Sequence, residues 1–252
     1  MEQNSSGGSR VAFFGGSFDP PHEGHLAVAR AARAALALDT VLFAPVGAQP
    51  LKPQGSTAGF DDRVAMTRLA IGGEPGFVVS LADAPRPSTA PNYTLDTLLI
   101  LRAEIAPGGE LFCLMGADSF LGLRGWYGAA EIPFVAPLIV ASRPGQPLDG
   151  LRDALPPGLT MEAAPGVGAG AKGMAGPAIE VRTWLLCNGA GESSPFYLLP
   201  GLHIEISASG IRRLIRGGVG EGEVAGSESR DSGPRLVPDA VLEYIHAHRL
   251  YR

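Results

Sequence analysis

The sequence contains little cysteine and has no long apolar run. Cys113 and Cys187 are the only cysteines among 252 residues, and they fit no CxxC or metal-ligand spacing. Both lie in apolar surroundings, so we expect two buried hydrophobic thiols rather than a disulfide framework or a zinc site. No uninterrupted apolar segment reaches the roughly 20 residues that a membrane-spanning helix needs. We therefore expect no membrane partner.

Basic clusters are also absent. The formal net charge is −5 and no run of lysine or arginine occurs, which argues against nucleic acid or an anionic membrane as a partner. The segment before Arg10 is polar and lacks the apolar stretch of a secretory signal. We expect a cytoplasmic protein, and no feature indicates an oligomeric state.

Hydrophobic residues make up 45% of the chain, which is enough for a substantial core. Strand-like and helix-like segments alternate through the first half. We expect strands over Val11–Phe14, Val41–Ala44, Phe77–Ser80, Leu111–Met115 and Leu138–Ala141. We expect helices over Leu26–Leu38, from a cap at Asp61 to about Ile71, and from Thr94 to about Ile105. This alternation predicts an α/β fold, a parallel sheet flanked by helices. Its ligands would bind beyond the carboxyl ends of the strands.

The second half is less regular. Residues 156–176 and 217–235 are rich in Gly, Ala, Ser or charge, and we expect both to be surface insertions, the first a mobile loop. The chain then forms a flexible tail over 1–10 and one domain over 11–252. Residues 168–173 satisfy GxGxxG, but no strand precedes them and low complexity produces such matches freely. No GxxxxGK[ST] motif exists, which excludes a P-loop enzyme.

The segment Gly15–His25 carries the strongest chemical signal. Two glycines follow a strand, and Pro20 and Pro21 precede a helix whose first N–H groups attract phosphate. His22 and His25 stand three residues apart, so their side chains share one face of the first helical turn. Two imidazoles there can donate hydrogen bonds to phosphate oxygens and stabilise developing charge.

A His-x-x-His pair can also bind zinc. No third Cys, His or carboxylate lies at a suggestive spacing, and Glu23 would project from a different face. The phosphate interpretation is therefore favoured over a metal site.

The segment resembles the nucleotidyltransferases with a Gly-x-Phe-Asp-x-x-His-x-Gly-His signature, and most closely the family of bacterial nicotinate-nucleotide adenylyltransferases. The resemblance runs in order from about Val11 to Arg252. Its matching pieces are Gly15–His25, Asn92-Tyr93-Thr94 with Thr97, Gly116-Ala117-Asp118-Ser119, Trp126-Tyr127, Ser142-Arg143-Pro144-Gly145, Ile206–Arg212, and the ending from Val237-Pro238 to Leu250-Tyr251-Arg252. It implies a Rossmann-like nucleotidyltransferase fold with a small C-terminal helical part.

Several residues are expected to bind ATP. Ser207 and Ser209 form a good helix N-terminus, and Arg212 lies one turn inside, where it can bind phosphate in a forked manner. The resemblance places this segment on the triphosphate opposite the two histidines, which makes His22, His25 and Arg212 the catalytic candidates. It also assigns ribose and nucleotide contact to Asp118, which can equally cap a helix. The remaining ATP candidates are Gly15, Gly16, Ser17, Phe18 and Lys52.

Aromatic residues are expected to bind the acceptor. Trp126 and Tyr127 lie in a glycine-flanked stretch, and an exposed indole offers a flat face for a pyridine ring. The resemblance implies ring stacking here, with Tyr93, Thr94 and Tyr127 around the ring carboxylate. The alternative is that the two aromatics anchor a loop to the core.

One position departs from the family pattern. Members commonly carry Pro-Pro-His-Lys/Arg after the second strand, whereas this chain has Gln49-Pro50-Leu51-Lys52. Leu51 therefore replaces the histidine, and any contribution of that histidine is lost or supplied elsewhere. Lys52 keeps the positive charge.

The implied reaction is adenylyl transfer from ATP to nicotinate mononucleotide in NAD biosynthesis, with Mg²⁺ arriving on the ATP phosphates. The acceptor phosphate is already anionic, so the site needs positioning and charge stabilisation more than a strong base. Alternatives are nicotinamide mononucleotide or phosphopantetheine as acceptor, or a nucleotide-binding regulator without turnover.

Overall fold

A computed structural model describes residues 8–50, 55–87, 90–142, 149–164, 179–202, 206–217 and 236–252. Within them lies an eight-stranded sheet with the order β3-β2-β1-β4-β5-β8-β7-β6. Its strands are β1 (Arg10–Gly16), β2 (Thr40–Pro45), β3 (Phe77–Val79), β4 (Glu110–Gly116), β5 (Leu138–Ala141), β6 (Leu159–Ala163), β7 (Arg182–Asn188) and β8 (Ser193–Leu199).

The first five strands and β8 run parallel to one another. Helices cover both faces of the sheet, so consecutive side chains on β1, β2, β4 and β5 are buried and these strands are nearly continuous apolar runs. The register pairs Gly15 with Ala44 and Gly16 with Pro45, which places the ends of β1 and β2 at one edge. The sequence prediction of an α/β fold with a parallel sheet flanked by helices is confirmed.

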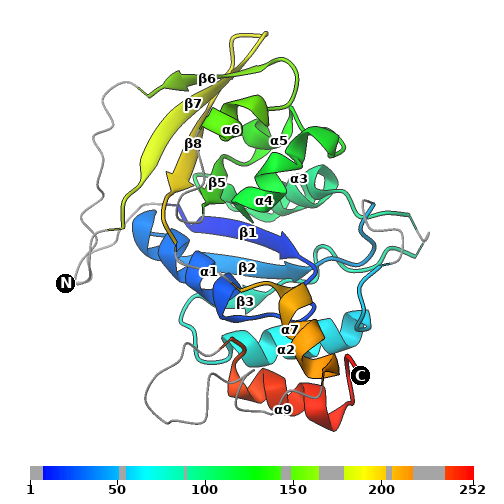
Figure 1. Cartoon of the computed structure of the whole chain (residues 1–252). Helices are drawn as coiled ribbons and strands as arrows, with labels where there is room; N and C mark the ends of the chain where they lie inside the picture. The colour runs from blue at the N-terminus through cyan, green and yellow to red at the C-terminus, as the bar shows by residue number, and fades with distance from the viewer. Residues whose placement is uncertain are drawn as a thin grey trace, which may run out of the picture.

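Helices divide between the two faces (Figure 1). One face carries α1 (Glu23–Ala35), α2 (Phe60–Ile71), α7 (Ala208–Arg216) and α9 (Asp239–Ala247). The other carries α3 (Thr94–Glu104), α4 (Ala117–Leu121), the 3-10 turn η1 (Leu123–Gly125), α5 (Ile132–Val135) and α6 (Asp149–Asp153). Each face has its own apolar core, the first centred on Phe14, Phe18 and Phe43 and the second on Leu98, Phe120 and Phe196.

The second half is more ordered than the sequence predicts. β6, β7 and β8 form an antiparallel extension of the sheet, and β6 occupies residues 159–163 of the segment expected to be a loop. Its side chains alternate between buried and exposed, as expected of a strand with one face on the core. The loop prediction for 156–176 is therefore wrong over β6. Residues 165–178, with the GxGxxG match, and residues 218–235 lie outside the described residues.

Two smaller predictions need correction. Asp61 was expected to cap α2, but Gly59 is the cap and Asp61 lies within the first turn. A carboxylate there still interacts favourably with the helix dipole. Cys113 is buried as expected, whereas Cys187 is partly exposed on β7, a strand whose residues are mostly half-buried. No helix in the described ranges is long and apolar enough to cross a membrane.

Candidate active site

A pocket of about 740 Å³ opens at the carboxyl ends of the parallel strands. Loops after β1, β2, β3 and β4 meet there with the start of α7, as the topology of a parallel sheet requires. Every described residue predicted to bind substrate or to act in catalysis lines it: Gly15, Gly16, Ser17, Phe18, His22, His25, Tyr93, Thr94, Asp118, Trp126, Tyr127, Ser207, Ser209 and Arg212. Lys52 and Leu51 lie outside the described residues.

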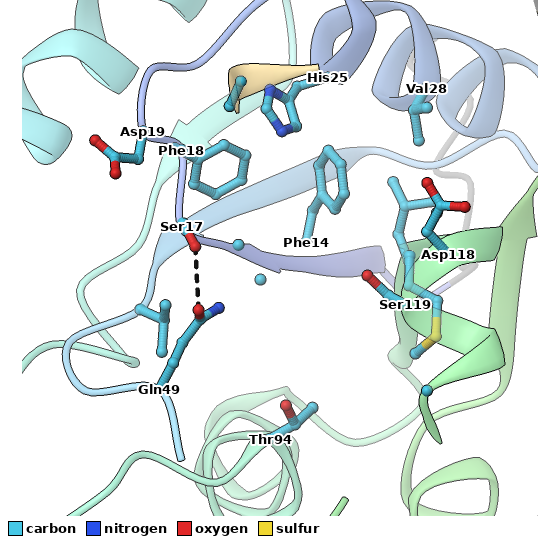
Figure 2. A pocket seen from close by; sticks show the side chains of 18 of the residues that line it. Phe14, Ser17, Phe18, Asp19, His25, Val28, Gln49, Thr94, Asp118 and Ser119 are labelled. Atoms are coloured by element: carbon cyan, nitrogen blue, oxygen red, sulfur yellow. Dashed lines mark hydrogen bonds between the residues drawn. The ribbon is translucent and has the colours of Figure 1, made fainter. Parts of the chain in front are cut away.

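The turn after β1 is held from behind by buried polar groups. Phe18 has a positive φ of 46°, a region that a bulky residue occupies only when its surroundings enforce it. Arg63, 2% exposed, donates to the carbonyls of Ser17, Val46 and Ala58. The Asp19 carboxylate points away from the pocket (Figure 2) and accepts the N–H groups of Thr57 and Ala58. These contacts fix the turn that lines the pocket.

The two histidines form a stacked pair at the start of α1. Their ring centroids are 3.7 Å apart with an interplanar angle of 28°, and His22 is the helix cap. The His22 backbone N–H donates to Nδ1 of His25 at 3.2 Å. Since Nδ1 accepts, the neutral His25 ring carries its proton on Nε2. Burial, and after it the charge of the His22 ring, lower the pKa of His25 well below its usual value. His25 is thus a neutral N–H donor at physiological pH.

Helix α7, which is distant in sequence, contacts the turn after β1. Nη1 of Arg212 donates to the backbone carbonyl of Asp19 at 2.6 Å, across 193 residues of sequence. Ser207 caps the helix, because its Oγ accepts from the Gly210 N–H at 3.2 Å. The same Nη1 lies 3.8 Å from Oδ2 of Asp19. Among the described residues no other partner of the Arg212 guanidinium is found, so its other N–H groups can serve a phosphate, which a planar fork binds in a bidentate way.

Aromatic side chains line another corner of the pocket. The rings of Tyr93 and Tyr127 lie 4.7 Å apart, and Tyr127 is 58% exposed. Trp126 follows η1 and is partly buried against the second core. The indole therefore both packs on the core and lines the pocket, so the two interpretations of this pair are compatible. Two flat rings facing a pocket form a site suited to a planar heterocycle.

Buried polar groups support that corner. Asp83, 3% exposed, accepts the Thr97 hydroxyl at 2.9 Å, while Asn92 donates to the carbonyls of Asp83 and Ala84. Burial raises the pKa of Asp83 to about 6, against the lowering effect of these hydrogen bonds and of Arg86. The cluster ties the loop after β3 to the first turn of α3.

The end of the chain also reaches the β1 turn. The Tyr251 hydroxyl donates to Oδ1 of Asp19 at 2.8 Å, across 232 residues, and the side chain is 4% exposed. Burial, and then the charge of Asp19, raise the pKa of this phenol. Two segments distant in sequence, through Arg212 and Tyr251, therefore converge on Asp19.

Comparison with known proteins agrees with this architecture. Residues 13–214 match a family model described as cytidylyltransferase-like. A Geobacter metallireducens protein named "probable nicotinate-nucleotide adenylyltransferase" is 35% identical over 242 residues, covering 96% of this chain and 98% of that one. The chain belongs to the nicotinate-nucleotide adenylyltransferase family.

Other relatives in this family have the same name. The Gloeobacter violaceus protein is 46% identical over 142 residues, which cover 56% of this chain and 68% of the relative. A solved structure of the Plasmodium falciparum nicotinic acid mononucleotide adenylyltransferase, complexed with NaAD, superimposes with a TM-score of 0.59 over 96% of this chain. Its sequence identity is 14%, so the likeness shows a shared fold.

Sequence reasoning missed the residues that support the site of this family member. Asp83, Arg63 and Tyr251 each act through a tertiary contact, and Asp19 entered only as part of a motif. A signal existed for two of them. Asp83 lies in the loop after β3, and Arg63 lies in the first turn of α2, next to the buried Val64. A charged side chain at either place is expensive to bury unless it is paired.

Proposed function

We propose that this protein transfers the adenylyl group of ATP to nicotinate mononucleotide. An oxygen of the acceptor 5′-phosphate attacks the α-phosphorus of ATP in line. The bond from that phosphorus to the oxygen bridging to the β-phosphate breaks as the new bond forms. The products are nicotinate adenine dinucleotide (deamido-NAD) and pyrophosphate, as the activity named for the relatives requires.

The observation that supports this proposal is the contact between Arg212 and the Asp19 carbonyl. It brings the start of α7 against the turn that leads to His22 and His25, so two helix N-termini and their cationic or N–H side chains face one pocket. Such an arrangement binds several phosphates at once. A regulator that binds a single nucleotide has no need of the added aromatic corner at Tyr93 and Tyr127.

In the proposed reaction, the chain binds and positions rather than abstracting a proton. The neutral Nε2–H of His25 donates to a phosphate oxygen, and Arg212 balances the charge that accumulates on the leaving pyrophosphate. Asp118, at the start of α4 across the pocket from Ser17 in Figure 2, would accept from a ribose hydroxyl. Tyr93, Trp126 and Tyr127 would hold the pyridine ring.

Magnesium would enter with ATP as part of the substrate. Among the described residues, no three His, Cys, Asp or Glu side chains gather as ligands for a metal ion. The phosphates themselves would therefore supply most of the coordination, which suits an ion that keeps several of its waters.

A pyrophosphate-release assay tests the proposal. Purified full-length protein is mixed with MgATP and, in separate reactions, nicotinate mononucleotide, nicotinamide mononucleotide or phosphopantetheine. We expect release with the nicotinate compound and turnover several-fold lower, or absent, with the others. Tight ATP binding without release from any acceptor would instead indicate a regulator, and preference for the amide would overturn the assigned acceptor.

The role of His25 is tested in the same assay. Because loss of one preorganised donor costs about 10²–10³-fold in kcat, His25→Ala is expected to lower kcat by about that factor. His246→Ala, on the exposed face of α9, is the matched control and should retain turnover. Unchanged turnover in His25→Ala would remove the catalytic role of this residue.

A further inference from the structure

Among residues 46–50, the described part of the segment after β2, Gln49 is the one polar side chain. The backbone that precedes it is held by hydrogen bonds to the loop after β3. Gly47 donates its N–H to the Asp83 carbonyl at 2.8 Å. Ala48 donates to Oδ1 of Asn92 at 3.0 Å and accepts the Asn92 N–H at 2.9 Å. A Cβ atom at Gly47 would lie 2.4 Å from the backbone nitrogen of Pro85, so the two loops touch closely. These contacts fix the backbone that leads to Gln49.

The Gln49 carboxamide is hydrogen-bonded to the turn after β1. Its Oε1 accepts the Ser17 hydroxyl at 3.2 Å, and within the described part of the chain this is the hydrogen bond that its side chain makes. Figure 2 shows the amide nitrogen directed into the open part of the pocket rather than toward the loop. A carboxamide nitrogen carries two N–H donors, so the pocket wall presents a neutral double donor at this point.

The place of Gln49 in the pocket identifies the group that it faces. In Figure 2 it lies between Ser17, on the β1 turn, and Thr94, at the start of α3, and opposite Asp118. The β1 turn is where the transferred phosphorus must sit, and the aromatic corner beside Thr94 is where the pyridine ring is proposed to bind. The acceptor phosphate has to span these two points, and therefore passes the Gln49 amide.

We propose that Gln49 is an acceptor-binding residue whose amide donates to the 5′-phosphate of the mononucleotide and aims it at the α-phosphorus of ATP. This inference rests on the proposed function. The family pattern has a histidine at position 51, where this chain has Leu51, which has no polar group. Gln49, two residues earlier, would supply a neutral donor in its place. Its partner Ser17 holds the amide oxygen and so orients the nitrogen.

Gln49→Glu tests the proposal with almost no change in shape. The carboxylate can still accept from Ser17, but it turns a double donor into a negative charge facing a phosphate. Because a hydrogen bond to a charged group is lost and repulsion is added, KM for nicotinate mononucleotide should rise by about 10-fold or more. KM for ATP should change less than about 2-fold. Gln49→Lys, which restores donors and adds positive charge, should bring the acceptor KM back to the wild-type value or below it.

Leu99→Glu is the control for adding one negative charge, since Leu99 is 51% exposed on α3 and does not line the pocket. It should leave both KM values unchanged. An unchanged acceptor KM in Gln49→Glu, or a rise in the ATP KM alone, would overturn the assignment of Gln49. Failure of the wild-type protein to release pyrophosphate with nicotinate mononucleotide would instead contradict the proposed function, so the two failures are distinguishable.

Discussion

At the scale of single residues, the pocket owes its shape to polar side chains that do not themselves have to touch substrate. The Arg63 guanidinium donates to three backbone carbonyls. The Asp19 carboxylate accepts from two backbone N–H groups and from the Tyr251 hydroxyl. Buried charges of this kind are costly unless every partner is in place. Their completeness is what permits Phe18 to hold its left-handed backbone conformation next to the ligand.

The buried carboxyl group of Asp83 should make the free energy of unfolding depend on pH. Burial raises its pKa from 3.8 to about 6, so between about pH 4 and pH 6 the folded state binds more protons at this site than the unfolded state does. The contribution of Asp83 to stability therefore falls as the pH rises through this window, and the full cost of ionisation is present above it. One pKa unit corresponds to about 1.4 kcal/mol. As the pH rises from 4 to 7.5, the free energy of unfolding of Asp83→Asn should therefore increase by about 2 kcal/mol relative to that of the wild type.

Urea unfolding of both proteins at the two pH values measures this difference. Asp153→Asn, on the exposed part of α6, controls for the loss of a surface carboxylate. A pH dependence of stability that is the same in Asp83→Asn and wild type would show that Asp83 is ionised in the folded protein across this range.

At the scale of elements, the site is built from helix beginnings. α1 begins after His22, α3 after Tyr93, α4 after Gly116 and α7 after Ser207, and residues at each of these four starts line the pocket. The first N–H groups of a helix have no partner within it, so they attract anions. An adenylyl transfer site needs this, because it must hold four phosphate groups before the reaction without placing many lysines in the wall.

The two serines of α7 should separate structural from ligand roles. Ser207 accepts from the Gly210 N–H, so Ser207→Ala should lower stability by about 1 kcal/mol, the usual cost of losing such a cap. Ser209 is not the cap of α7, and its hydroxyl lies 3.4 Å from that of Ser207. Ser209→Ala should therefore leave the melting temperature unchanged and raise KM for ATP. Thermal unfolding and initial rates distinguish the two, and an unaltered KM in Ser209→Ala would remove its proposed contact with ATP.

At the scale of the whole molecule, the chain folds back on itself. The turn after β1 is contacted by Arg212 from α7 and by Tyr251, which follows α9, so residues more than 190 positions away in sequence contact Asp19. Leu236 takes part as well, since its carbonyl accepts the N–H of Glu23 in the first turn of α1. Stability and activity should therefore share a dependence on the C-terminal segment.

Tyr251→Phe tests this dependence. Removing a hydroxyl that donates to a buried carboxylate should cost about 1.5–3 kcal/mol of stability, and it should also weaken ATP binding because Asp19 fixes the phosphate turn. Tyr244→Phe is the matched control. Its hydroxyl likewise donates to a carboxylate, that of Asp62 at 3.0 Å, but joins α9 to α2 away from the pocket. Loss of ATP affinity in both variants, or in neither, would contradict a specific role for Tyr251.

Much of this protein was predictable because its signals are local. Gly15–His25, the apolar strands and the capped helix start at Ser207 each depend on neighbours within a few residues, and the structure has them in place. The strands β6, β7 and β8 were not predicted, because they lie in a Gly-rich half of the sequence and form through tertiary pairing: β8 pairs with β5, β7 with β8, and β6 with β7.

The sequence by itself determined the alternation of strands and helices in the first half, the turn that is predicted to bind phosphate and the family, since backbone propensities and motifs are short-range properties. Only the tertiary structure decided which residues hold the turn and which side chains line the pocket. Asp83, Arg63 and Tyr251 acquire their roles from partners that are distant in sequence. In the sequence, Gln49 is one polar residue in a loop. In the structure, Asn92 holds that loop through Ala48, and Ser17 donates to the Gln49 amide oxygen at the pocket. Long-range contacts fix side-chain direction, and the direction of donors is what a phosphate-transfer site depends on.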